Sequence, residues 1–163
     1  MKTRVSLGVG VAAIVATILI GIGAQSGFAQ GDPLIGTWVL NVAESKYTPG
    51  PPPKEQTTIF EAAGEGVKGT TKGTDSAGKP TGTTYTANYD GKDYPVTGSP
   101  DWDTVSLNRI NASTVEYTRK RAGKVVQTAT GVVSKDGKTR TITSTGVNAQ
   151  GQKIHNVGVY DKK

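Results

Sequence analysis

Apolar and polar side chains alternate along most of the chain after residue 35, in short runs that end at turn residues. A period of two is typical of half-buried strands, because successive side chains of a strand point to opposite faces. Asp90-Gly91 and Asp136-Gly137 each separate two such runs, and Asp-Gly favours a two-residue hairpin turn. The pattern predicts no helix and ten strands, at residues 36–42, 55–62, 65–74, 80–89, 92–97, 103–110, 113–122, 124–134, 138–146 and 152–161.

Nearly every connection between these predicted strands has the length of a hairpin, which indicates a meander. A long meander either exposes two unpaired edges or closes on itself, and closure removes the edges. We therefore expect an all-β fold, an antiparallel up-and-down barrel of about ten strands, with an open sandwich as the alternative. Two connections are longer. Residues 43–54 contain Pro-Gly-Pro-Pro-Pro, a stiff segment that is expected to cross one end of the barrel, and residues 98–102 form the second break.

The first 29 residues have a different composition. Lys2 and Arg4 precede an uncharged apolar run over residues 5–24, and Gly27 and Ala29 supply the small residues that precede a cleavage site. This order predicts a signal peptide at 1–29 and a single domain at 30–163, periplasmic or secreted, with no stable membrane insertion after cleavage. The alternative is an uncleaved anchor, since the apolar run approaches the roughly 20 residues that span a bilayer.

Composition and charge argue against several classes of activity. The chain has no Cys and only one His, His155, which excludes disulfides and thiolate metal sites and leaves a His-dependent nucleophile or metal site without partners. The formal charge of +6 falls to +4 without Lys2 and Arg4, and the remaining basic residues are spread along the strands rather than gathered in a block. Residues 64–69 fit the spacing Gly-x-Gly-x-x-Gly, but a strand follows instead of the required helix. We expect no enzyme activity, cofactor, metal or nucleic acid, and a monomer.

The first and last predicted strands carry a resemblance to a known superfamily. Gly36-Thr37-Trp38 opens the first strand as Gly-x-Trp opens that of lipocalins and fatty-acid-binding proteins, and residues 157–162 look like the closing strand of the latter. The sequence thus resembles the calycin superfamily. Residues 41–47 and 90–92 look more like secreted bacterial lipocalin-like proteins of unassigned role. The resemblance implies structural roles for Gly36 and Trp38, with the Trp packed across the closed end of the barrel.

The chain also departs from the fatty-acid-binding pattern. That family carries Arg-x-Tyr in its last strand to hold the carboxylate of the ligand, whereas this chain has Gly158 in the position of the Arg and keeps Tyr160. The resemblance therefore implies a ligand contact for Tyr160 without its arginine. Residues 43–54 are too few and too rich in proline for the family's two-helix lid.

Arginines inside the predicted strands are the main candidates for ligand binding. Arg109 shares its strand face with Leu107, Arg119 shares its face with Tyr117, and Arg140 has the parity of Ile142. If the apolar face is the interior, these guanidinium groups point inward, where a charge requires an acid, water or an anionic ligand. The alternative is that these strand ends lie at the rim of the barrel and reach solvent.

Tyrosines provide a second set of candidates. Tyr85 and Tyr89 share one strand face, and rings with a polar tip suit either a pocket or an ordinary core. Trp102 lies in a Pro-Asp loop and is expected to be a tolerant loop residue. The sequence predicts an exported protein that binds a small hydrophobic or amphiphilic, possibly anionic, molecule through Arg109, Tyr117, Arg119, Tyr85 and Tyr160. The alternative is a structural or interaction module of the cell envelope with a solid barrel, and an enzyme that uses acids alone is a third reading.

Overall fold

The computed structural model describes residues 31–163, so the predicted signal peptide lies outside the described residues. The described chain consists of strands and turns, and no helix in it could cross a membrane. The strands are β1 (Gly36–Leu40), β2 (Lys46–Thr48), β3 (Glu55–Ala63), β4 (Gly66–Thr74), β5 (Pro80–Asn88), β6 (Tyr94–Thr97), β7 (Thr104–Asn111), β8 (Thr114–Arg121), β9 (Lys124–Val133), β10 (Thr139–Val147) and β11 (Lys153–Lys162).

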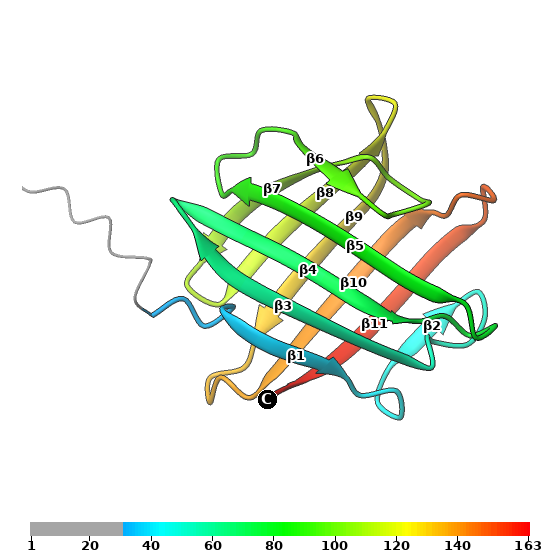
Figure 1. The fold of residues 1–163 in the computed structure, drawn as a ribbon, viewed down its shortest axis with the longest axis horizontal. Coiled ribbons are helices and arrows are strands. Elements are labelled where there is room, and N and C mark those ends of the chain that lie inside the picture. The colour runs from blue at the N-terminus through cyan, green and yellow to red at the C-terminus, as the bar shows by residue number, and fades with distance from the viewer. Residues whose placement is uncertain (1–30) are drawn as a thin grey trace, which may run out of the picture.

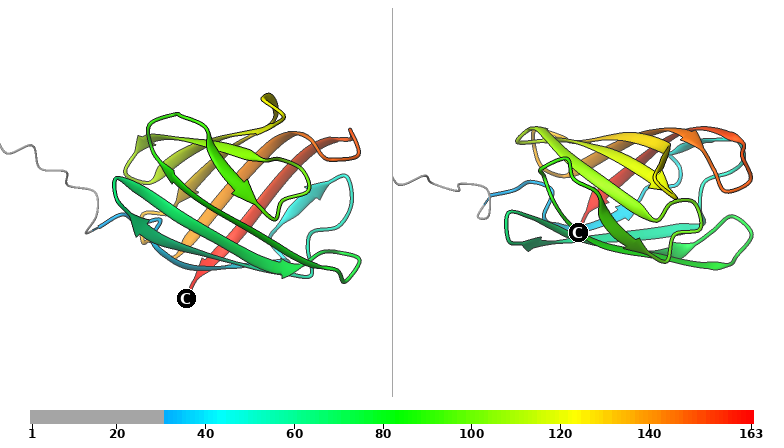
Figure 2. Two further views of the ribbon diagram at one scale, coloured as in Figure 1. Left: turned by 45° about the horizontal axis from the view of Figure 1, so that its top comes forward. Right: turned by 90° about the horizontal axis from the view of Figure 1, so that it is seen from above.

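The strands form one closed antiparallel barrel. Ten of them follow one another around it in chain order, and β1 closes the circle by pairing with β11, where Leu40 lies opposite Tyr160. The barrel is flattened, with β3, β4 and β5 on one side and β8 to β11 on the other (Figures 1 and 2). Closure confirms the predicted barrel and excludes the open sandwich.

All ten predicted strands are confirmed, and one additional strand was missed. β2 has three residues within the proline-rich connection and pairs with β11 beyond the end of β1, with Tyr47 opposite Asn156. The second long connection follows β6, which is joined to β5 and to β7 by only two residue pairs each. β6 is therefore the most weakly paired strand among the ten that form the barrel.

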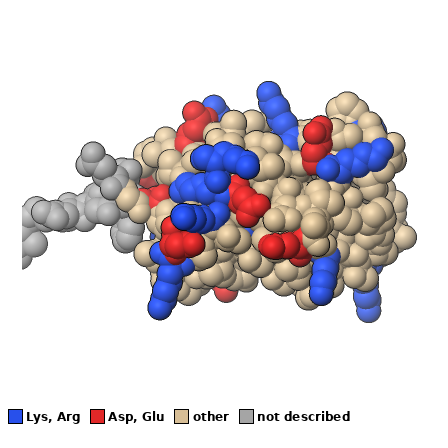
Figure 3. Space-filling view, turned by 90° about the horizontal axis from the view of Figure 1, so that it is seen from below, with Lys and Arg blue, Asp and Glu red and all other residues tan. Residues whose placement is uncertain are grey.

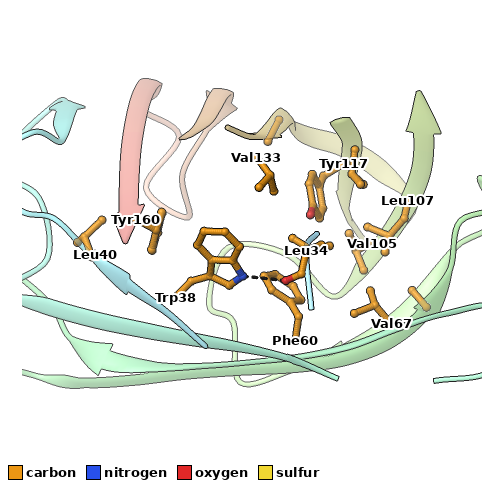
Figure 4. Packing of buried hydrophobic residues seen from close by; sticks show 13 residues of the cluster. Leu34, Trp38, Leu40, Phe60, Val67, Val105, Leu107, Tyr117, Val133 and Tyr160 are labelled. Carbon is orange, nitrogen blue, oxygen red and sulfur yellow. Dashed lines mark hydrogen bonds between the residues drawn. The ribbon is translucent and has the colours of Figure 1, made fainter. Parts of the chain in front are cut away.

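An apolar core fills one end of the barrel around Trp38. The Trp38 side chain is fully buried, and its Nε1 donates a hydrogen bond to the carbonyl oxygen of Leu34 at 2.7 Å (Figure 4). The core consists of the buried residues Leu34, Trp38, Leu40, Phe60, Val67, Ala87, Val105, Leu107, Val115, Tyr117, Ala129, Val133 and Tyr160. Trp38 therefore packs across the closed end of the barrel, as the calycin resemblance implied.

Gly36 allows the end of the chain to fold over Trp38. Its φ is +133°, a conformation that favours glycine, and a Cβ at this position would lie 2.8 Å from Cε of Lys162. Because glycine has no Cβ, the Lys162 side chain can lie against Gly36. Its Nζ lies 5.0 Å from the centre of the Trp38 ring and donates a hydrogen bond to the carbonyl oxygen of Pro33 at 3.0 Å. Gly36 and Trp38 of β1 thus both lie against Lys162 of β11, the last strand of the barrel.

A buried ion pair holds the residues before β1 against the closed end. Asp32 pairs with Arg109, and both side chains are almost completely buried. The Tyr89 hydroxyl donates to the same carboxylate at 3.1 Å, and the Arg109 guanidinium carbon lies 3.9 Å from the centre of the Tyr89 ring. Arg109 therefore has an internal acid as its partner, at the end of the barrel that the apolar core fills.

Charged side chains of both signs are interspersed on the exterior. In the face shown in Figure 3, acidic groups lie between basic ones, and no broad patch of one sign covers it. Exposed pairs such as Lys68 with Glu61, 3.2 Å apart, are of this kind. Two arginines, Arg119 and Arg140, lie inside the barrel instead.

Candidate functional site

The inward-facing side chains change from apolar to polar along the barrel axis. On β3 they run from Phe60 through Thr58 to Gln56, and on β8 from the buried Val115 through Tyr117 to Arg119. The apolar ends of these series form the core around Trp38. The polar ends surround the space that remains in the other half of the barrel, so that the barrel has one closed and one open end.

A cavity of about 360 Å³ occupies this polar half. Its volume lies within the range of small-molecule sites, near the lower limit. Side chains from both walls of the flattened barrel and from the connections at its open end line it. The lining residues include Gln56, Thr58, Phe60, Thr71, Thr83, Tyr85, Asp101, Trp102, Tyr117, Arg119, Gln127, Arg140, Ser144 and Tyr160.

Arg140 forms part of the floor of the cavity. It is only 4% exposed, and its guanidinium carbon lies between 5.1 and 5.9 Å from the ring centres of Phe60, Tyr117 and Tyr160. Nη2 donates a hydrogen bond to the Tyr117 hydroxyl at 3.1 Å. Gly131 makes room for this group, since a Cβ there would lie 2.9 Å from Nη2. A charged side chain thus stands among aromatic rings at the bottom of the lumen.

Arg119 lies higher on the cavity wall. Its Nη1 donates to Oε1 of Gln127 at 3.1 Å, and its guanidinium carbon lies 4.9 Å from the centre of the Trp102 ring. Its Nε is buried and has no hydrogen-bond partner among the described residues. Burial lowers the pKa of Arg119, and the positive charge of Arg140 acts in the same direction. The two cations are therefore close enough to repel each other.

No acid in the described part of the chain neutralises these two arginines. Each salt bridge within residues 31–163 involves Arg109 or a lysine. Among the described residues, Asp101 is the one acid that lines the cavity. Its Oδ1 accepts a hydrogen bond from the backbone N–H of Ala149 at 2.7 Å, which links two connections at the open end. Burying charge without a counter-charge is costly, so the lumen is suited to an anion.

Tyrosine hydroxyls supply neutral hydrogen-bonding groups around the arginines. Burial raises the pKa values of Tyr47, Tyr85 and Tyr160 above their usual value near 10. The Tyr160 hydroxyl accepts a hydrogen bond from Nε2 of Gln56 at 3.1 Å. These phenols stay protonated at neutral pH and contribute no negative charge that would compensate the arginines.

The raised pKa values predict that the protein loses stability in alkali. The folded state favours the protonated phenols, so this contribution is complete below the unfolded pKa of about 10 and declines as the pH rises above it. We expect the free energy of unfolding to fall above pH ~10. In the folded protein the phenolate absorbance of Tyr47, Tyr85 and Tyr160 should appear at a higher pH than in the unfolded chain. A spectrophotometric titration beside a denaturant-unfolded sample measures this. Coincident curves for both samples would contradict the buried phenols.

Four of the five predicted ligand-binding residues line the cavity. Tyr85, Tyr117, Arg119 and Tyr160 come together from β5, β8 and β11. Arg109 does not belong to this group. Strand parity correctly places it on the inner face, but it lies at the closed end with Asp32 as its partner, and the expectation of a shared lumen with Arg119 has to be corrected.

Two residues of the cavity were not among the five predicted ligand contacts, although the parity of Arg140 had already placed it on the inner face. Arg140 lies directly opposite Tyr160 in the β10–β11 ladder, so an arginine stands beside this tyrosine although Gly158 replaces the one expected within the same strand. Trp102 is not a free loop residue, because it is partly buried, lines the cavity and contacts Arg119. For Arg140, the signal in the sequence was that it shares its strand face with Ile142. For Trp102 there was no such signal, because the alternation of strand faces does not extend to a loop.

The described residues contain no group of three or more His, Cys, Asp or Glu side chains that could hold a metal ion. The cavity is lined by two guanidinium groups, the Asp101 carboxylate, several hydroxyls and amides, and aromatic rings. Guanidinium groups are able to hold an anionic group through charge-assisted hydrogen bonds.

The barrel has the closed antiparallel architecture of calycin-like proteins. Rv2717c from M. tuberculosis matches it with a TM-score of 0.54 at 13% identity, over 80% of this chain and 93% of that protein. The zebrafish ileal bile acid-binding protein, in complex with cholic acid, aligns with a TM-score of 0.48 at 14% identity, over 80% and 99% of the two chains. At these identities the similarity concerns the fold alone. No family model and no curated protein sequence matches the chain.

Proposed function

We propose that this protein is exported and binds a small anionic amphiphile in the lumen of its barrel, with the anionic group beside Arg119 and Arg140. The observation that carries the proposal is the pair of arginines in the cavity for which the described chain provides no acid. An anion between two neighbouring cations removes their repulsion and supplies the missing counter-charge. The aromatic rings around Arg140 offer contact to an apolar part of the same molecule.

A cavity of this size supports binding over a purely structural role. The alternative of a structural or interaction module assumes a solid barrel, in which core side chains fill the interior. Here the lining includes small polar residues on both walls, with the hydrogen-bonded pair Thr58 and Thr71 on β3 and β4 and Ser144 on β10. Export is supported by the basic head, apolar run and small residues of the first 29 positions.

The test is a titration with a charged probe and its uncharged counterpart. Anilinonaphthalene sulfonate carries an anionic group on an aromatic body, and phenylnaphthylamine has the same rings without the sulfonate. We expect saturable binding of one sulfonate molecule per chain, at least about tenfold tighter than the amine, which corresponds to one charge-assisted hydrogen bond. Fluorescence of Trp102, on the cavity wall, should change on binding.

Two results would contradict this function. The absence of saturable binding of either probe would remove the ligand-binding role, and equal affinities would remove the role of the arginines. Mass spectrometry of exported material tests the location separately: the chain should begin near Gln30, and a membrane-retained chain that begins at Met1 would contradict export.

A further inference from the structure

The polar walls of the cavity restrict the kind of anion that fits it. A straight hydrocarbon chain inserted above Arg140 would cover hydroxyl and amide groups on both sides of the flattened barrel without bonding to them. A polar group that is buried without a hydrogen bond destabilises the complex. Several such groups line this small volume, so an alkyl chain is a poor complement to it.

Three hydroxyl groups in the lining are free to form hydrogen bonds with a ligand. Within residues 31–163, the side-chain hydroxyls of Thr83, Tyr85 and Ser144 have no protein partner, and all three residues line the cavity. None of the three belongs to the completely buried, unsatisfied side-chain atoms, so each hydroxyl keeps contact with the open space. Thr83 and Tyr85 lie on β5 and Ser144 on β10, on opposite walls of the barrel.

Ring systems suit the remainder of the lining. Flat surfaces come from the rings of Phe60, Tyr85 and Tyr117 on three strands and from Trp102 in the connection before β7. Such surfaces pack well against a flat or compact ring. The volume of about 360 Å³ equals roughly a dozen water molecules in the liquid. It therefore favours a short, compact molecule over a long, extended one.

We infer that the ligand is an oxygen-rich anion on a compact ring framework, with hydroxyl or carbonyl groups that bond to Thr83, Tyr85 and Ser144. This inference rests on the proposed function, which places an anionic group beside Arg119 and Arg140, and it adds the chemistry of the remainder of the molecule. The ligand is held by charge at one end, by hydrogen bonds to both walls, and by ring packing between them.

A matched pair of carboxylates tests the inference by calorimetric titration of the full protein. Cinnamate and caffeate have the same skeleton and charge, and caffeate carries two additional hydroxyls; dodecanoate represents the alkyl anions. A neutral hydrogen bond contributes between about twofold and tenfold in affinity. We expect caffeate to bind about tenfold tighter than cinnamate and tighter than dodecanoate. Displacement of anilinonaphthalene sulfonate confirms that the compounds share the cavity.

Variants identify the groups responsible. Tyr85→Phe with Ser144→Ala removes two hydroxyls that have no protein partner, so the fold should persist while most of the caffeate advantage disappears. Thr128→Val removes a hydroxyl from an exposed position on β9 and should leave every affinity unchanged. Equal binding of cinnamate and caffeate, tighter binding of dodecanoate, or an undiminished caffeate advantage in the double variant would overturn the inference and leave the proposed function intact. If no anion binds, both fail.

Discussion

Replacing Trp38 with Ala should lower the free energy of unfolding by about 3 to 5 kcal/mol, as truncation of large buried aromatic residues generally does. The side chain is fully buried in the apolar core and donates a hydrogen bond to Leu34. The substitution would leave a cavity between β1 and the opposite wall, and it would deprive the Lys162 side chain of the ring that it covers. Denaturant unfolding followed by circular dichroism measures the loss.

Trp102 supplies the matched control for this measurement. It lies at the open end on the cavity wall and is only partly buried. Trp102→Ala should therefore lower the free energy of unfolding by about 1 kcal/mol, the typical value for a point substitution. Because Trp102 contacts Arg119, this variant should change probe binding, whereas the smaller change Trp38→Phe should not. Equal losses of stability for the two alanine variants would show that the closed end has been misassigned.

Most of the fold could be predicted because alternation and hairpin turns are local properties. Each of the ten strands carries its own period-two pattern, and Asp90-Gly91 and Asp136-Gly137 punctuate it. β2 could not be found in this way, because a strand of three residues beside Pro49 has too few positions to show a period. It exists because β1 ends at Leu40, which leaves part of the β11 edge available for pairing.

The candidate site was predictable only in part, because strand parity determines the face of a side chain but not its depth in the barrel. Arg109 and Arg119 both point inward. Their environments differ because Asp32, which is 77 residues away from Arg109 in sequence, comes to lie beside one of them. The place of Arg140 likewise depends on the space that Gly131 leaves on the neighbouring strand. Such relations follow from how the strands assemble, and no single strand contains them.

The two inward arginines of adjacent strands should respond in opposite ways to the same substitution. Arg119→Met removes a cation that has no acidic partner, so the protein without ligand should be as stable as the wild type or more stable. Its affinity for anilinonaphthalene sulfonate should fall roughly tenfold to a hundredfold, since a charge-assisted hydrogen bond contributes about 1.5 to 3 kcal/mol. The affinity for phenylnaphthylamine should change little.

Arg109→Met should show the reverse. It leaves the Asp32 carboxylate buried beside Tyr89 without its counter-charge, and removing one partner of a buried ion pair generally costs about 3 to 5 kcal/mol. Affinity for the sulfonate should remain that of the wild type, because Arg109 does not line the cavity. Chemical unfolding and probe titration of both variants measure the two effects on the same samples. If Arg119→Met destabilises the protein as much as Arg109→Met, or if the sulfonate binds Arg119→Met as tightly as the wild type, Arg119 is a structural group and the anion is not bound by it.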